Sequence, residues 1–176
     1  MTDERGSLSP VDTALREELA ATLTEPGESL AVRLDAAVAL AEADDARAFE
    51  TLVMVLNYRD PGLADTAARA LARLADPRTS RAAAALATNP LRTAYALPAI
   101  RLLVSLREPE AVPALTRTLE RLLTEPGSPY RRIALACVEG LGELADRRAV
   151  PVLRSASEDP RLREAADAAL ARVERA

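Results

Sequence analysis

The stretch EGLGELADRRAVPVL, residues 139–153, contains the spacing from which the rest of the chain can be interpreted. Leu141 precedes Asp146 by five residues, and Leu153 follows Asp146 by seven. A leucine also stands five residues before an acidic residue in three earlier segments: Leu40 before Asp45, Leu71 before Asp76 and Leu103 before Glu108. Together with Leu170 in the last segment, these leucines lie 31, 32, 38 and 29 residues apart. The chain therefore has an internal repeat of about thirty residues.

Each repeat is expected to hold two helices. The tripeptide Ala-Val-Pro opens the second helix at 111–113 and again at 149–151, where proline is tolerated because the first-turn amides have no helical partner. The acidic residue before each second helix is expected to cap that helix or to face the positive end of its dipole. We interpret these carboxylates as structural groups, not catalytic ones. Pro98 falls inside an expected helix over 91–106 and predicts a kink there.

Composition supports an all-helical protein. Apolar residues make up 49% of the chain but aromatic residues only 2%, so the core must be built from alanine and branched aliphatic side chains. No apolar run approaches the ~18 residues of a membrane span, and the acidic N-terminus lacks the features of a signal peptide. The single cysteine fits a reducing compartment. We therefore expect a cytoplasmic protein with no membrane association.

The expected fold class is all-α, a right-handed α-solenoid of antiparallel helix pairs. We expect residues 1–8 to be disordered and residues 9–176 to form one domain. Its expected elements are an N-terminal capping helix over 9–24, repeats at about 28–58, 60–88, 89–124 and 128–157, and a C-terminal capping helix over 160–175. The pentapeptide Leu-Thr-Glu-Pro-Gly occurs at 23–27 and at 123–127 and is expected to end a helix both times. The polar outer faces of the end helices predict a monomer.

These features resemble HEAT-like repeats, and the resemblance covers residues 28–176. It is carried by Val32-Arg33, Ala36–Leu40, Asp45, and the segments 139–146, 149–153 and 159–170. The repeat length is similar to that of the short HEAT-like repeats first described in phycobilin lyases, rather than to longer eukaryotic units. The unit over 62–88 departs from the pattern, with Ala64 in place of an arginine and a thin second helix over 81–87. The unit over 89–127 departs by being long.

The resemblance implies protein binding for most members of this fold, although some members are enzymes. HEAT-like deoxyhypusine hydroxylases hold two irons with histidine and glutamate, and this chain has no histidine. HEAT-like DNA glycosylases use a basic groove with aromatic side chains, whereas this chain has a net charge of −4 and no tryptophan, which argues against nucleic-acid binding. The chromophore contacts of phycobilin lyases cannot be mapped onto this sequence.

The residues offer little catalytic chemistry. Without histidine the chain lacks the usual neutral-pH base and the commonest metal ligand. Cys137 lies in an apolar segment and is interpreted as a buried core residue. Gly140 and Gly142 lack the spacing of a phosphate-binding loop and are expected to allow close helix packing. We therefore expect a protein that is not an enzyme and has no cofactor and no metal.

Surface recognition is what remains. In a curved solenoid of helix pairs the second helices conventionally line the concave side, so we expect another protein or peptide to bind there. The chain is then a non-catalytic scaffold or adaptor; the alternative is a lyase-like accessory factor that handles a cofactor or tetrapyrrole on a partner protein. The small side chains over 82–85 predict a shallow trough on the same face. The candidate partner-binding residues are Glu50, Met54, Asn57, Tyr58, Arg81, Arg117, Arg121 and Arg154, and among them Met54 and Tyr58 lie one turn apart.

Overall fold

The computed structural model describes residues 10–125 and 127–176 of the chain. The disorder predicted for residues 1–8 lies outside the described residues. The described part of the chain forms ten α-helices and two short 3-10 helices and contains no strand. In chain order these are α1 (Pro10–Thr24), α2 (Leu30–Glu42), α3 (Ala48–Leu56), α4 (Pro61–Leu74), α5 (Thr79–Thr88), η1 (Pro90–Tyr95), α6 (Leu97–Leu106), α7 (Ala111–Leu123), α8 (Arg131–Leu144), η2 (Arg147–Ala149), α9 (Val150–Glu158) and α10 (Arg163–Arg175).

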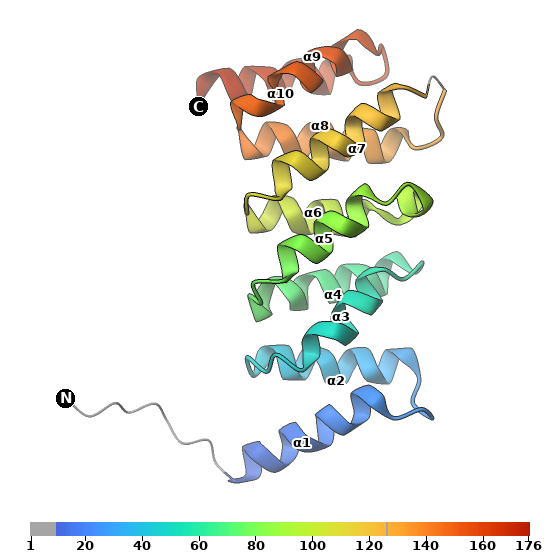
Figure 1. Cartoon of the computed structure of the whole chain (residues 1–176), viewed down its shortest axis with the longest axis vertical. Coiled ribbons are helices and arrows are strands. Elements are labelled where there is room, and N and C mark those ends of the chain that lie inside the picture. The colour runs from blue at the N-terminus through green and yellow to red at the C-terminus, as the bar shows by residue number, and fades with distance from the viewer. Residues whose placement is uncertain (1–9, 126) are drawn as a thin grey trace, which may run out of the picture.

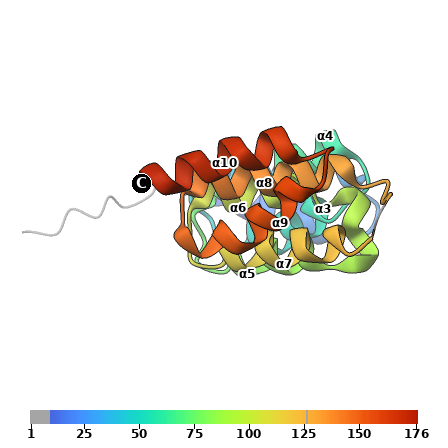
Figure 2. The ribbon, with the colours of Figure 1, turned by 90° about the horizontal axis from the view of Figure 1, so that it is seen from above.

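The helices pack in two layers that run the length of the molecule (Figure 1). The first-helix layer contains α2, α4, α6, α8 and α10, and the second-helix layer contains α1, α3, α5, α7 and α9 (Figure 2). Connections within a repeat lie along one edge of the molecule and connections between repeats along the opposite edge (Figure 1). The all-α solenoid of antiparallel helix pairs predicted from the leucine spacing is confirmed.

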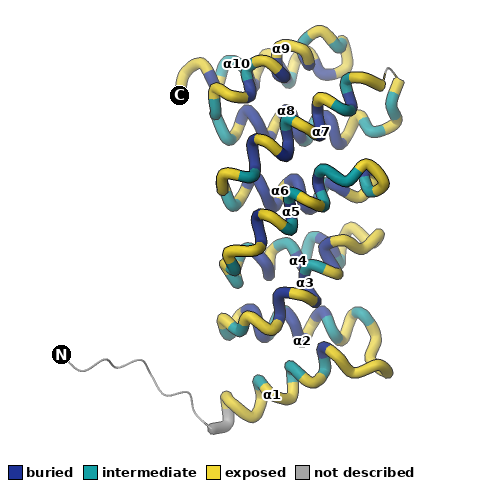
Figure 3. The backbone as a smooth tube through the Cα atoms, in the orientation of Figure 1, coloured by how far each residue is buried: buried dark blue, intermediate teal, exposed yellow. Residues whose placement is uncertain are grey.

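The repeating leucines form the core between the layers. The side chains of Leu40, Leu71, Leu103 and Leu141 are completely buried, and the buried residues lie where the two layers face each other (Figure 3). Burial of one such leucine contributes about 1.5–3 kcal/mol to folding. Leu170 in the last helix is only half-buried, because no further repeat covers it.

The turn between the two helices of a repeat is held by an aspartate and the arginine two residues later. Asp76 Oδ1 accepts hydrogen bonds from the backbone N–H of Arg78 at 2.9 Å and from its Nε at 3.0 Å, while Oδ2 accepts one from Nη2 at 2.9 Å. The aspartate lies two positions before the N-cap residue of α5, so it closes the turn rather than capping the helix directly. The same arrangement occurs within repeats in the pairs Asp45–Arg47 and Asp146–Arg148, and between repeats in the pair Asp159–Arg161 before α10. Between α6 and α7 the matching positions hold Glu108 and Glu110 instead.

The kinked helix predicted over residues 91–106 is wrong. Residues 90–95 form η1, and Pro98 lies in the first turn of α6. The side chain of Asn89 accepts a hydrogen bond from the N–H of Leu91 at 3.0 Å and so begins the separate element. The first-turn residues of a helix have no helical partner for their backbone N–H groups. Pro98, which lacks this group, can therefore stand at the start of α6 without loss of a helical hydrogen bond.

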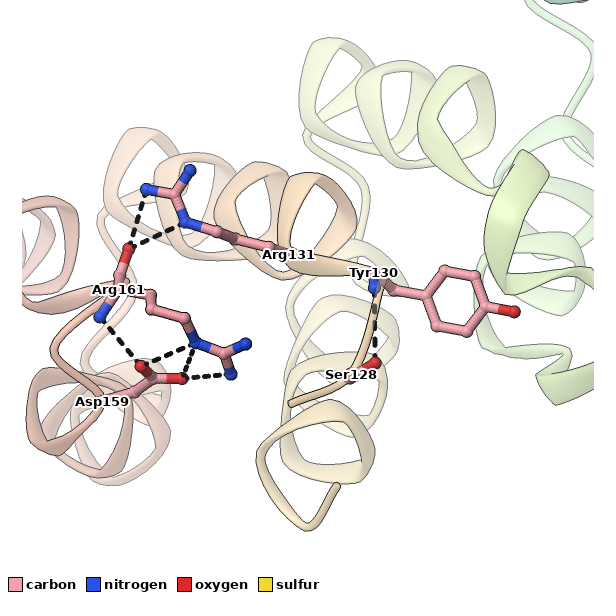
Figure 4. A network of polar contacts seen from close by, with 5 residues as sticks. All are labelled: Ser128, Tyr130, Arg131, Asp159 and Arg161. Carbon is pink, nitrogen blue, oxygen red and sulfur yellow. Dashed lines mark hydrogen bonds and ion pairs between the residues drawn. The ribbon is translucent and has the colours of Figure 1, made fainter. Parts of the chain in front are cut away.

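The two Leu-Thr-Glu-Pro-Gly segments make the same local contacts. The N–H of Glu28 donates to the carbonyl of Glu25 at 3.2 Å, and the N–H of Ser128 donates to the carbonyl of Glu125 at 3.0 Å. Each segment therefore ends a helix in a turn that leads into the next first helix. After the second segment, Arg131 donates to the carbonyl of Arg161 at 3.1 and 3.3 Å, which ties α8 to the turn before α10 (Figure 4).

Candidate functional site

Two of the candidate partner-binding residues, Glu50 on α3 and Arg81 on α5, are exposed but take part in ion pairs. Glu50 on α3 accepts from Nη1 of Arg78 at 3.1 Å, and Nε of Arg81 on α5 lies 3.6 Å from Oε1 of Glu110. The guanidinium of Arg78 also lies 3.9 Å from the ring centroid of Phe49. Exposed pairs of this kind contribute about 0–1 kcal/mol. These contacts join neighbouring repeats and give Glu50 and Arg81 a structural role as well as an exposed position.

The three predicted arginines on α7 and α9 are not equivalent. Arg117 and Arg154 are exposed, whereas Arg121 is half-buried. Nη2 of Arg121 is buried and has no hydrogen-bond partner among the described residues. Arg121 is close enough to Cys137 to lower the pKa of its thiol slightly, so it faces α8 rather than solvent. The expectation that Arg121 is exposed is therefore wrong.

The predicted trough is present between α5 and α7. A hollow of about 410 Å³ is lined by Ala84, Ala85, Pro113 and Arg117, among others. Ala85 is exposed and Ala84 is half-buried, so neither residue is covered by its neighbours. The short side chains of α5 leave this space open.

Exposed apolar side chains lie elsewhere, on the last turn of α3 and on the connections after α3 and α5. Met54 is 47% exposed, Tyr58 49%, Leu91 89% and Tyr95 37%. Most of the large apolar side chains that are exposed among the described residues belong to this group of four. The others lie on α1 and α2. The guanidinium of Arg92 donates to the carbonyl of Asn57 and ties the two connections together. We name Met54, Tyr58, Leu91 and Tyr95 the apolar edge.

A pocket opens at this edge. The Tyr58–Tyr95 pocket, about 250 Å³ in volume, is lined by Tyr58, Arg59, Pro61, Ala64, Asp65, Ala94, Tyr95, Leu97, Pro98, Arg101, Arg132 and Ile133. The guanidinium carbon of Arg59 lies 5.9 Å from the centroid of the Tyr95 ring, and that of Arg92 lies 5.3 Å from it. Cations at this distance from an aromatic ring are attracted to it. Two arginines therefore lie near the ring of Tyr95.

The pocket continues onto the first-helix layer. It shares Arg101 with a hollow of about 440 Å³ between α4 and α6 and with another of about 380 Å³ between α6 and α8. Nη1 of Arg101 lies 3.7 Å from Oδ2 of Asp65. Of the predicted residues, only Tyr58 lines this pocket. Met54 and Asn57 lie close to it in sequence, whereas Arg117 lines the hollow between α5 and α7.

Sequence reasoning missed Tyr95, Arg59, Arg101 and Arg132. The available signal was the scarcity of aromatic residues, since a tyrosine in a chain with 2% aromatic residues is unusual wherever it occurs. Nothing local in the sequence shows that Tyr58 and Tyr95 share a pocket.

In residues 10–125 and 127–176, no cluster of histidine, cysteine, aspartate or glutamate side chains is arranged to hold a metal ion. Burial raises the pKa of Cys137 to about 12, with Arg121 opposing the shift, so its thiol stays protonated at neutral pH. None of the helices in the same described ranges combines the length and apolar character of a membrane span.

Comparisons with known proteins agree with this architecture. The PBS lyase HEAT-like repeat matches residues 133–159, which span most of α8 together with η2 and α9. A chain in the structure of the complex of CpcE and CpcF of phycocyanin lyase from Nostoc sp. PCC7120 is similar to this chain, with a TM-score of 0.61 and 22% identity. The match covers 100% of this chain and 69% of that one.

Human deoxyhypusine hydroxylase, in a structure with glycerol, aligns with 93% of this chain and 98% of its own at 15% identity, but its TM-score of 0.32 is too low to carry an argument. No curated protein sequence matches the chain. At 22% identity the lyase structure shows the fold alone. The repeat spacing, the two-layer architecture and these matches agree on a HEAT-like α-solenoid fold, with a PBS lyase HEAT-like repeat at residues 133–159.

Proposed function

We propose that this protein is a non-catalytic interaction module that binds another polypeptide through the apolar edge. The observation that carries the proposal is that Met54, Tyr58, Leu91 and Tyr95 are exposed on the last turn of α3 and on the two connections that the Arg92–Asn57 hydrogen bond ties together. Exposed apolar side chains that gather in one place are typical of protein interfaces, and tyrosine is a frequent anchor residue there. A partner would remove these side chains from water.

The similarity in fold supports a protein partner. The structure to which this chain is similar is a complex of two lyase subunits. Stacked helix pairs of this kind present long surfaces suited to binding other polypeptides. The trough between α5 and α7, with Arg117 at its border, offers a second contact region on the second-helix layer.

The test is affinity capture with the full chain from a native lysate, with bound polypeptides identified and quantified by mass spectrometry. The wild-type protein should recover one polypeptide in stoichiometric amount. The double variant Met54→Glu with Tyr58→Ala should not recover this polypeptide, because it removes two apolar side chains of the apolar edge. Both side chains are about half exposed, so their replacement leaves the core unchanged. Circular dichroism should show that the double variant remains folded.

A matched control is Val32→Glu, which changes an apolar side chain of α2 that is 42% exposed and lies outside the apolar edge. This variant should recover the partner as the wild type does. Full recovery by the Met54 and Tyr58 variant would contradict the proposal. Equal loss of the partner by Val32→Glu would contradict the assignment of binding to the apolar edge.

A second candidate function is a lyase-like accessory factor that handles a cofactor or tetrapyrrole on a partner protein. It is favoured by the PBS lyase HEAT-like repeat at residues 133–159 and by the similarity to a chain of the phycocyanin lyase complex. An absorbance scan of the purified protein from 300 to 750 nm distinguishes the two candidates. A bound chromophore in stoichiometric amount would support the accessory factor, and a spectrum with protein absorbance alone would favour the interaction module.

A further inference from the structure

We propose that the Tyr58–Tyr95 pocket binds an acidic segment of the partner polypeptide. This inference rests on the proposed function, because it assigns a chemistry to the partner at the same edge of the molecule. Three arginines line the pocket, Arg59, Arg101 and Arg132, and Asp65 is the one acidic residue in the lining. The chain as a whole carries a net charge of −4, so this basic cluster runs against the overall charge.

Two of the three arginines are available to a ligand. Arg101 is paired with Asp65 at 3.7 Å. Arg59 and Arg132 are exposed and form no ion pair with any described residue. A guanidinium donates parallel hydrogen bonds to both oxygens of a carboxylate, which makes arginine the preferred cation for such recognition.

The wall of the pocket is held in place before any ligand arrives. Asp60 accepts hydrogen bonds from the N–H groups of Gly62 at 2.8 Å and Leu63 at 3.0 Å, which fixes the start of α4 next to Arg59. The ring of Tyr95 lies against the guanidiniums of Arg59 and Arg92. A cation that stacks on a ring keeps its N–H groups free at its edge, where a carboxylate can approach. Little ordering of the pocket is needed on binding.

Size and surroundings favour a polypeptide segment over a small molecule. The pocket volume of about 250 Å³ lies below the roughly 300–1,000 Å³ of small-molecule sites. It shares Arg101 as a lining residue with hollows along α4, α6 and α8. Met54 and Leu91 of the apolar edge lie close in sequence to the two tyrosines of the pocket and offer apolar contacts to a bound segment. An extended segment can place an acidic side chain in the pocket and continue across these surfaces.

The test is fluorescence anisotropy of a labelled hexaglutamate peptide titrated with the full-length protein at pH 7 and low salt, with labelled hexaglutamine as the uncharged control. Hexaglutamate should bind saturably and hexaglutamine should not, and binding should weaken with added salt. The double variant Arg59→Gln with Arg132→Gln should bind hexaglutamate about tenfold more weakly, since it removes two charge-assisted contacts. The matched control Arg147→Gln with Arg172→Gln, which changes exposed arginines outside the pocket and the trough, should stay within about twofold of the wild type.

Three outcomes would overturn the inference. Hexaglutamine could bind as tightly as hexaglutamate, or the control double variant could lose as much affinity as the pocket variant. Free glutamate could also displace hexaglutamate at an equal concentration of carboxylate, which would show a site for free carboxylates instead of a polypeptide segment. Circular dichroism of each variant confirms that a lost affinity does not come from unfolding.

The inference and the proposed function can fail separately. If partner capture depends on Met54 and Tyr58 but hexaglutamate does not bind, the inference is wrong and the interaction module stands. If hexaglutamate binds through Arg59 and Arg132 but no polypeptide depends on the apolar edge, the proposed function is wrong and the pocket alone retains its preference for acidic chains.

Discussion

Within residues 10–125 and 127–176, four residues other than glycine adopt left-handed backbone geometry, and all four follow the end of a first helix. Their φ angles are 54° at Asp44, 51° at Ala75, 56° at Arg107 and 55° at Ala145. Each stands one residue before the acidic residue of the turn. Left-handed geometry costs about 1–2 kcal/mol for a residue with a Cβ atom, so the repeated turn carries strain in every unit.

Ala75→Gly is expected to stabilise the protein by about 0.5–1 kcal/mol. Glycine relieves the strain at φ 51°, and this gain is partly offset because glycine is more flexible in the unfolded chain. Ala75 is exposed, so no core contact is lost. Chemical denaturation followed by circular dichroism measures the change.

The control for this prediction is Ala72→Gly, three residues earlier in α4. The backbone there is helical, and glycine should destabilise by about 1 kcal/mol. If both variants lose stability to the same extent, the left-handed strain at Ala75 does not limit stability.

At the scale of the element, the four turns that contain an aspartate–arginine pair make the stability of the protein depend on pH. Hydrogen bonds from Arg78 hold the pKa of Asp76 below its ordinary value of 3.8, and the pKa values of Asp45, Asp146 and Asp159 are lowered by the matching arginines. A lowered folded-state pKa means that the unfolded state binds protons first as the pH falls. The contribution of these turns is therefore present above a pH of about 4 and is lost as the pH falls through the folded-state values.

Asp76→Asn is expected to lower the melting temperature at pH 7 and to flatten its dependence on pH below about 4. The amide can still accept the N–H of Arg78 but cannot form the ion pair, and it does not titrate. Thermal melts of both proteins between pH 2.5 and 7 measure the effect. The control Asp35→Asn, an exposed change on α2 outside any turn, should leave the dependence of melting temperature on pH unaltered. If the melting temperatures of Asp76→Asn and wild type fall in parallel at acid pH, the prediction is contradicted.

Helix α8 approaches α10 closely because Gly142 has no side chain. A Cβ atom there would lie 2.7 Å from Cβ of Ala169 and 2.8 Å from its Cα, which belongs to the backbone of α10. At Gly140 the added atom would instead meet Cγ2 of Val104 at 2.6 Å and Cδ2 of Leu115 at 2.8 Å, which are ends of side chains. Side-chain ends can change rotamer, whereas a helix backbone must move as a unit.

Gly142→Ala is expected to destabilise the protein by about 1–2 kcal/mol, because overpacking against α10 exceeds the roughly 1 kcal/mol by which alanine favours helix. Gly140→Ala should destabilise less. Gly27→Ala, where nothing lies within 4 Å of the added atom, serves as the control and should be close to neutral. Urea denaturation ranks the three variants; a stabilised Gly142→Ala would show that α10 shifts without cost.

At the scale of the whole molecule, the main helix contacts lie within a repeat or between neighbouring repeats, so stability is distributed along the stack. Gly142→Ala should therefore speed amide hydrogen exchange in α8, α9 and α10 while leaving α2 and α3 close to their wild-type rates. Exchange followed by mass spectrometry of peptides resolves the two ends. Equal acceleration along the whole chain would show that the solenoid opens as a single unit.

The repeat, the helix pairs and the buried leucines could be predicted because each follows from local periodicity. Leu71 and Leu141 are buried for the same reason, since each lies on the apolar face of a first helix at the same distance from its turn. Pro98 was misplaced because a proline is compatible with either a kinked helix or a new helix start, and contacts around Asn89 decide between them. The exposure of Arg121 was misjudged because α7 turns that side chain toward α8.

By itself the sequence determined the architecture: leucines about thirty residues apart can be buried together only if successive helix pairs stack, and that constraint is local and repeated. The tertiary structure alone decided where a partner can bind. Tyr58 and Tyr95 lie 37 residues apart in the chain and share a pocket because the connections after α3 and α5 meet at one edge of the stack. The exposure of these side chains depends on how neighbouring repeats pack, and no local pattern of residues specifies that packing.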